Sequence, residues 1–252
     1  MTDRLARLSA DALKFATSCG FDDPGSTSRR LYRFNNIPAS SYWRSRLDRP
    51  EDARQFLALH GTVSWANAFR THIDDSAHWW HWSRIGANKP KDGRTFKLYV
   101  SCLPSDLPDA LHTVGHSLIR SDAFGFKVGH DAIGVLRSDK LVIYFMDREA
   151  MESAARSLTQ SLSGISVQGV PFTSQLEPAG LISAGIDPPS PPEGSKKMSY
   201  SWRSWLTATL GQWLEQESKD GSTDPVAAAL SRLSTFGVNT QTWAVQAEAL
   251  TQ

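Results

Sequence analysis

Side chains able to bind an anion and to donate a proton alternate along one short segment of the chain. Lys97, Tyr99 and Ser101 occupy every second position of residues 96–102, a run that is otherwise apolar or aromatic. Alternate residues of a β-strand point to the same face of a sheet. A strand here would therefore place an ammonium group beside two hydroxyl groups, a set that suits a negatively charged ligand.

Three further cations have both a chemical and a simpler structural interpretation. Lys127 lies in an apolar run and is either a reactive lysine or a strand lysine whose stem covers apolar surface. Arg203 is flanked by tryptophans, so it either binds an anion or stacks on the indole rings. Arg137 lies in a predicted turn, where a solvated surface position is the simpler interpretation.

Two histidine pairs have spacings that could bind a metal ion from one face of a helix. His78 and His81 are three residues apart, and His112 and His116 are four apart. Neither pair has a cysteine or carboxylate nearby in a metal-binding pattern, so we predict no metal site and no cofactor. His130 is an alternative proton donor.

The elements that must hold these residues alternate between strands and helices in the middle of the chain. Apolar and β-branched runs predict strands, and apolar residues at helical spacing predict helices. The predicted strands cover 96–102, 125–128 and 141–146, and the predicted helices cover 107–120 and 148–162. This pattern predicts an α+β fold, an α/β sandwich in which a central, mainly antiparallel sheet is flanked by helices.

Helical segments are predicted on both sides of this middle part. The N-terminal helices are expected at 2–18 and 51–70, and the C-terminal ones at 200–216 and from Asp224 to Gly237. Residues 180–195 are rich in proline and predict a loop, which is either a linker or a lid over a site. A further loop is expected at 86–93.

Composition excludes several classes of protein. A formal net charge of +1 over 252 residues gives no support to a nucleic-acid binder. The two cysteines, Cys19 and Cys102, have no disulfide or metal-binding spacing. The first ten residues lack the apolar core of a signal peptide, and no stretch approaches the roughly 18 apolar residues of a membrane span. We therefore expect a cytoplasmic protein without a membrane partner, although export as an effector through a needle-type machine stays open.

The order and spacing of several short motifs resemble a known enzyme superfamily. Residues 96–101 (FKLYVS), 126–128 (FKV) and 141–145 (LVIYF) are similar to the core of the phosphothreonine-lyase superfamily. The downstream motifs are similar to those of HopA-type effectors and of the stand-alone lyases of class V lanthipeptide and thioamitide biosynthesis. These motifs are Pro171 to Thr173, Pro178 to Gly180, Ala184 to Pro188 and Ser199 to Arg203. The resemblance covers residues 94–215.

The resemblance implies a role for each candidate residue. Lys127 falls at the position of the family's general base, and Lys97 falls beside the phosphate. Arg203 falls on a phosphate-binding arginine, and Arg137 is a looser match for a second one. Tyr99 stands where the best-known members have a histidine that acts as general acid. A tyrosine there fits the HopA-type branch and would be the proton donor.

The implied reaction is β-elimination of phosphate from phosphoserine or phosphothreonine, which leaves dehydroalanine or dehydrobutyrine and needs no metal-bound water. The base must be neutral, whereas a free lysine has a pKa of about 10.4. Burial and neighbouring cations lower the pKa of a lysine. The same cations would stabilise the charge that develops on the departing phosphate.

The resemblance also implies partners and a single phosphothreonine-lyase-like domain over residues 1–252. We expect a helical N-terminal region at 1–93, a catalytic core at 94–215 and a C-terminal helical segment at 216–252. The expected substrate is a phosphorylated precursor peptide. A separate Ser/Thr kinase would supply the phosphate, because the sequence has no ATP-binding motif. Two alternatives stay open: a catalytically silent phosphopeptide- or kinase-binding module or translocated effector of the same fold, and a phosphatase.

Overall fold

One seven-stranded sheet lies at the centre of the computed structural model, which describes residues 3–21, 25–74, 78–87, 95–188 and 201–245. The order across the sheet is β1-β2-β4-β5-β3-β7-β6, and each neighbouring pair is antiparallel. The strands are β1 (Phe69–Asp74), β2 (Trp79–Arg84), β3 (Phe96–Val100), β4 (Gly125–Gly129), β5 (Leu141–Phe145), β6 (Ser174–Gln175) and β7 (Ile182–Ile186).

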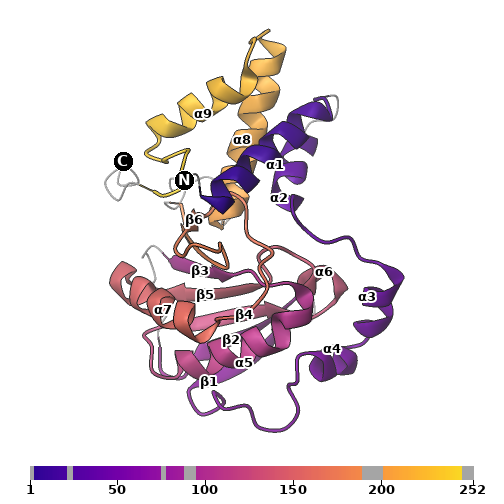
Figure 1. Cartoon of the computed structure of the whole chain (residues 1–252), viewed down its shortest axis with the longest axis vertical. Coiled ribbons are helices and arrows are strands. Elements are labelled where there is room, and N and C mark those ends of the chain that lie inside the picture. The colour runs from indigo at the N-terminus through magenta and orange to yellow at the C-terminus, as the bar shows by residue number, and fades with distance from the viewer. Residues whose placement is uncertain (1–2, 22–24, 75–77, 88–94, 189–200, 246–252) are drawn as a thin grey trace, which may run out of the picture.

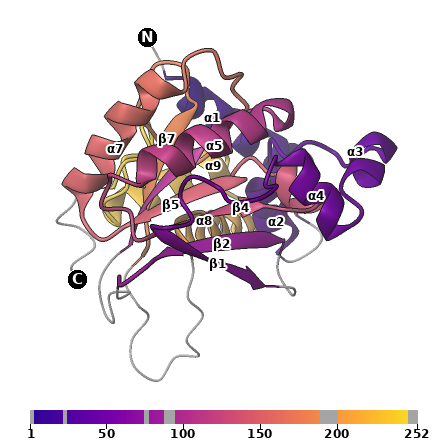
Figure 2. The same cartoon turned by 90° about the horizontal axis from the view of Figure 1, so that it is seen from below.

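Two helices, α5 (Leu107–Leu118) and α7 (Arg148–Ser161), cover one face of the sheet (Figures 1 and 2). Alternate strand residues point to that face and are apolar and buried, such as Leu98 of β3 and Ile143 of β5. Each such side chain contributes roughly 1.5–3 kcal/mol when it is removed from water. This layer therefore forms the larger hydrophobic core of the described residues.

A second group of helices packs at the β7 end of the sheet (Figure 1). It consists of α1 (Arg4–Ser18), α2 (Ser26–Arg33), α8 (Trp202–Lys219) and α9 (Pro225–Thr235). These helices share their own core, to which α8 contributes Leu206 and Leu210. The side chain of Trp202, at the start of α8, lies against the backbone of Gly185 on β7 and joins the helical group to the sheet.

Three shorter helices lie along the side of the sheet, α3 (Ser41–Arg46), α4 (Pro50–Phe56) and α6 (Ala132–Val135). The carboxylate of Asp131 accepts the backbone N–H of Gly134 and so begins α6 directly after β4. The turn that follows α6 returns the chain to β5. This turn holds residues 137–140, which become important for the site.

The sheet face opposite α5 and α7 is polar. Paired strand residues share a face, and the register aligns His81 of β2 with Lys127 of β4, and Lys97 of β3 with Tyr144 of β5. Tyr99 belongs to the same face, because it lies two residues after Lys97. The fold therefore gathers basic and hydroxyl side chains on the side that the apolar core does not use.

The structure confirms the predicted α+β class, with an antiparallel sheet, flanking helices and a helical N-terminal region. The helix predicted at 51–70 is wrong beyond Phe56, because Ala58 and Gly61 adopt positive φ angles and end it. Residues 69–74 and 79–84 form β1 and β2. In the predicted loop at 180–195, residues 182–186 form β7.

Two sequence-based expectations lie outside the described residues, namely the loop at 88–93 and the proline-rich stretch from 189 onward with Ser199 and Tyr200. No helix among the residues that the structure describes is long and apolar enough to cross a membrane.

The contact between β7 and α8 predicts that Gly185→Ala destabilises the protein. A Cβ atom at Gly185 would lie 2.5 Å from Cδ1 of the fully buried Trp202, so one element must shift. We expect a loss of about 1–3 kcal/mol in the free energy of unfolding, measured by urea denaturation. Trp202→Leu should cost less in the Gly185→Ala background than in the wild type. Additive effects of the two changes would contradict this packing account.

Candidate active site

The polar face places three predicted site residues across neighbouring strands. Lys127 of β4 is aligned with Val142 of β5, and Val142 is aligned with Tyr99 of β3. Strands lie about 4.8 Å apart, so the backbones at Lys127 and Tyr99 are about 10 Å apart. Lys97 lies on the same face, two residues before Tyr99 on β3. The three side chains therefore share one face of the sheet, with Val142 between Lys127 and Tyr99.

Lys127 is half-buried, and its Nζ lies 4.0 Å from the centre of the Trp79 ring. Among the described residues it forms no ion pair. Burial lowers its pKa to about 8, against the opposing charge of Asp139 and with help from the positive charges of Lys97 and Arg137. At neutral pH a pKa near 8 leaves roughly a tenth of this amine unprotonated, far more than for an ordinary lysine.

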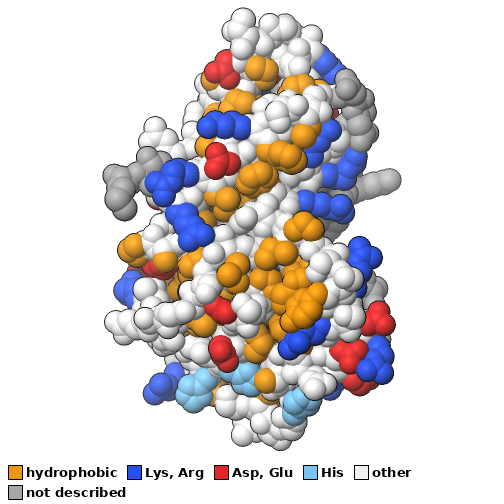
Figure 3. Space-filling model, turned by 45° about the vertical axis from the view of Figure 1, so that its right-hand side comes forward, with side chains coloured by type: hydrophobic (Ala, Val, Ile, Leu, Met, Phe, Trp, Pro, Cys, Tyr) orange, Lys and Arg blue, Asp and Glu red, His pale blue; other side chains and the backbone are white. Residues whose placement is uncertain are grey.

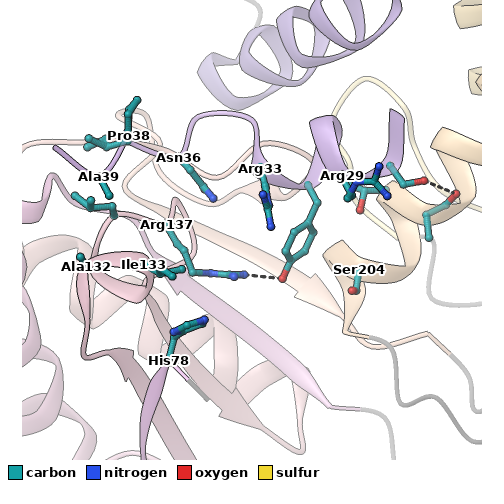
Figure 4. Close-up of a pocket in the computed structure, with 16 residues that line it drawn as sticks. Arg29, Arg33, Asn36, Pro38, Ala39, His78, Ala132, Ile133, Arg137 and Ser204 are labelled. Atoms are coloured by element: carbon teal, nitrogen blue, oxygen red, sulfur yellow. Dashed lines mark hydrogen bonds between the residues drawn. The ribbon is translucent and has the colours of Figure 1, made fainter. Parts of the chain in front are cut away.

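Arg137 and Arg203 both bind the carboxylate of Asp139, in the turn before β5. Arg137 makes a bidentate contact, with Nε 2.7 Å from Oδ1 and Nη2 3.0 Å from Oδ2. Arg203 Nη1, from α8, lies 2.8 Å from Oδ2. Tyr32 of α2 joins them. Its hydroxyl accepts from Arg137 at 2.6 Å, the dashed line that ends on Arg137 in Figure 4. Its carbonyl accepts from Arg203 at 2.8 Å.

These contacts set the charge states of the cluster. Burial alone would raise the pKa of Asp139, but the adjacent charges of Arg203 and Arg137 hold it well below its usual range. The Arg203 side chain is only 1% exposed, whereas that of Arg137 is 16% exposed and also lies over the Trp79 ring, 5.1 Å from its centre. Arg137 is therefore the arginine of this pair that an incoming anion can reach.

Lys97 is already paired with a carboxylate. Its Nζ lies 2.6 Å from Oδ1 of Asp187, which also accepts the N–H of Trp202 at 3.1 Å. The ammonium lies 5.5 Å from the centre of the Tyr144 ring. A cavity of about 320 Å³ opens at Lys97, Tyr144, Asp187 and His81. One carboxylate thus links β3 to the start of α8 and leaves Lys97 at the edge of an open space.

Tyr99 is 2% exposed and packs with Val142 and Val170. Burial raises its pKa well above the usual value, and the negative charge of Asp187 adds to the effect. The hydroxyl therefore keeps its proton at neutral pH and can donate a hydrogen bond, although it is a weak acid.

The segment after α2 holds the turn at 137–140 in place. Asn36 Oδ1 accepts the N–H of Ser138 at 3.0 Å, and the Ser138 carbonyl accepts the hydroxyl proton of Ser101 at 2.6 Å. The fully buried Lys140 donates to the carbonyl of Cys102 at 2.7 Å and to the side chain of Gln168. Ser101, which we grouped with Lys97 and Tyr99, is thus part of the support beneath the site.

The structure links the predicted residues in two pairs. Lys127 and Arg137 share the Trp79 ring, and Arg137 and Arg203 share Asp139 and Tyr32. Sequence reasoning missed Trp79, Tyr32, Asp139, Asp187 and Tyr144. The aromatic run at 79–82 carried a signal for the first of these, because in a strand Trp79 and His81 point to one face and the other two tryptophans to the opposite face.

His81 lies on the polar face beside Lys127, whereas His78, His112 and His130 make other contacts. His78 Nδ1 lies 2.5 Å from Asp131 Oδ2, and His112 Nε2 contacts the carbonyls of Leu57 and Ala58. His130, the alternative proton donor, stacks on Trp80, whose side chain lies on the sheet face opposite Lys127. Among the described residues no three His, Cys, Asp or Glu side chains are grouped to bind a metal ion.

We expect Asp139→Ala to destabilise the fold, because it leaves two buried guanidinium groups without their carboxylate. The expected loss is about 3–5 kcal/mol in urea denaturation at pH 7, with the exposed Asp109→Ala as the control. The Asp139 pKa is depressed in the folded state, so its contribution is present above the unfolded value near 3.9 and is lost as the pH falls below it. Equal stability of the two variants would refute the role of Asp139.

We also expect Lys127 to titrate near pH 8, as measured by NMR of isotopically methylated lysines. Trp79→Ala should raise the pKa of Lys127, because water then reaches an ammonium group whose burial is the main cause of the shift. An unchanged pKa in Trp79→Ala would show that the ring does not shield the amine.

Comparison with solved structures shows which known proteins share this fold. No protein-family model matches the sequence, and no curated protein matches it. The effector protein from Pseudomonas syringae pv. tomato strain DC3000 is similar in structure, with a TM-score of 0.57, 13% identity and coverage of 97% of this chain and 99% of that one.

The effector protein from Pseudomonas syringae pv. syringae strain 61 gives a TM-score of 0.52 at 12% identity, covering 97% of this chain and 100% of that one. The type III effector/phosphothreonine lyase OspF from Shigella flexneri gives only 0.43 at 15% identity, over 64% of this chain and 90% of that one, a score too low to support a conclusion. This chain therefore has the fold of the two Pseudomonas syringae effector proteins over nearly its whole length.

Proposed function

We propose that this protein is a lyase that eliminates phosphate from phosphoserine or phosphothreonine in a peptide. The observation that carries the proposal is Lys127, a half-buried lysine whose pKa is lowered to about 8 and whose amine forms no ion pair among the described residues. It faces a reachable arginine, Arg137, across the Trp79 ring. A base beside a cation is the combination that this elimination requires.

In the proposed step, neutral Lys127 removes the α-proton of the phosphorylated residue. The electron pair of the Cα–H bond forms the Cα–Cβ double bond, and the Cβ–O bond breaks as phosphate leaves with its electron pair. Arg137 and Lys97 would bind the phosphate oxygens, and Tyr99, which keeps its proton, would donate to the leaving oxygen. Arg203 is buried, so it would act through its charge and by holding Asp139 and Arg137.

The proposed setting is the biosynthesis of a ribosomally made, modified peptide of the lanthipeptide or thioamitide type. A separate kinase would phosphorylate the precursor peptide first. This part of the proposal is supported by the HopA-type motifs in the sequence.

A catalytically silent phosphopeptide-binding module is the second candidate. Two observations favour it: Tyr99 replaces the histidine acid of the best-known lyases, and Lys97 and Arg203 are already paired with carboxylates. A silent module would bind the same phosphopeptides and leave them unchanged.

The test is incubation of the full chain with phosphoserine and phosphothreonine peptides, followed by mass spectrometry. Elimination yields an alkene, hydrolysis yields the hydroxyl, and binding alone yields neither. We expect elimination, with kcat/KM rising toward pH 8 as Lys127 loses its proton. Lys127→Ala should lower the rate by about 10²- to 10⁴-fold, whereas the exposed Lys14→Ala should not. Full activity of Lys127→Ala would refute its assignment as the base.

A further inference from the structure

A second cavity, of about 730 Å³, lies beside Arg137 between the helical group and the sheet. Its walls come from α2, from the segment 36–39, from α6 and from the first half of α8, and His78 lines it from the side of β2. In Figure 4, Arg33, Arg137 and His78 extend from three different elements toward the same space. Its volume lies within the range of about 300–1,000 Å³ typical of ligand-binding clefts.

The charge of this cavity has one sign. Its lining includes Arg29, Arg33 and Arg137 and no aspartate or glutamate. Two acidic groups bind lining residues from outside the cavity, since Asp139 holds Arg137 and Asp131 holds His78. Arg33 is exposed and forms no ion pair among the described residues. The cavity therefore attracts an anion at a point separate from Lys97 and Lys127.

The opposite wall is apolar. Ile133 of α6 is 56% exposed, and Pro38, Ala132 and Leu136 lie around it. Figure 3, which brings forward the right-hand side of Figure 1, shows Lys and Arg side chains over the helical part and a hydrophobic patch below them. A ligand that fills the cavity thus meets positive charge on one side and aliphatic surface on the other. An extended peptide suits both walls, because its successive side chains point to opposite sides.

We propose that this cavity binds an acidic segment of the peptide substrate next to the phosphorylated residue. The proposal rests on the proposed function, and Arg137 joins the two sites because it contacts the Lys127 region through Trp79 and also lines the cavity. A carboxylate of the segment would face Arg33, and a neighbouring apolar side chain would cover Ile133.

The experiment compares three peptides that differ only beside the modified residue, with two glutamates before it, two glutamates after it, or glutamines on both sides. Binding is measured by fluorescence anisotropy on the full chain, with a phosphonate analogue that cannot be eliminated. Turnover of the matching phosphopeptides is followed by mass spectrometry. We expect one glutamate peptide to bind about two- to fivefold more tightly than the glutamine peptide, with the same ratio in KM and little change in kcat.

Arg33→Gln should remove that preference, and Arg33→Glu should reverse it. When all three peptides carry the same leucine next to the varied positions, Ile133→Ser should weaken the binding of each. Arg148→Gln, at an exposed position on α7, is the matched control and should change nothing. Equal affinity of all three peptides, or a preference that survives Arg33→Glu, would overturn the proposal even if elimination proceeds. A preference that depends on Arg33 without any elimination would instead refute the lyase activity and keep the peptide site.

Discussion

The carboxylate of Asp139 connects the parts of the molecule that the site needs. It binds Arg137 from its own turn and Arg203 from α8, and Tyr32 of α2 completes the contacts. A buried guanidinium beside a half-buried one needs a counter-charge, because the desolvation of a buried ion costs several kcal/mol. Asp139 therefore sets the direction of Arg137 and, together with Asp187 and Trp202, holds the helical group against the sheet.

The same cluster also affects the base. Burial and the charges of Lys97 and Arg137 lower the pKa of Lys127, and the negative charge of Asp139 raises it. Asp139 has to be close enough to hold the arginines and far enough from Lys127 not to pair with it. The Lys127 ammonium lies over the Trp79 ring, whereas Asp139 is bound by Arg137 and Arg203.

Regular patterns of apolar residues allowed the central elements to be predicted. The runs at β3 and β5 and the helices α5 and α7 bury one consistent face, so their periodicity is visible in the sequence. The strand β2 was not predicted because its tryptophans occupy both faces. Trp80 and Trp82 lie in the core and Trp79 lies over the site, so the sequence shows no alternation of apolar and polar residues. β7 was missed because glycine and proline surround its short apolar run.

For the site, the sequence pointed to the cations but not to the groups that orient them. Lys97, Lys127 and Arg137 lie on or beside strands whose motifs could be read directly. Asp139 and Asp187 could not be found that way, because each acts on residues far away in the sequence: Asp139 meets Arg203, and Asp187 meets both Lys97 and the start of α8. Such partners follow from tertiary packing, which no local pattern records.

The charges of the polar face have a consequence for product release. Among the described residues, Lys97, Lys127, Arg137 and Arg203 face two carboxylates, Asp139 and Asp187, so the cluster has two more cations than anions when Lys127 is protonated, as it is after it has taken the α-proton. The two negative charges of one phosphate dianion balance that excess, whether the dianion is inorganic phosphate or part of a phosphopeptide. Under the proposed function, the product would compete with the substrate for the same charges. Discrimination between them would then have to come from the peptide and not from the phosphate.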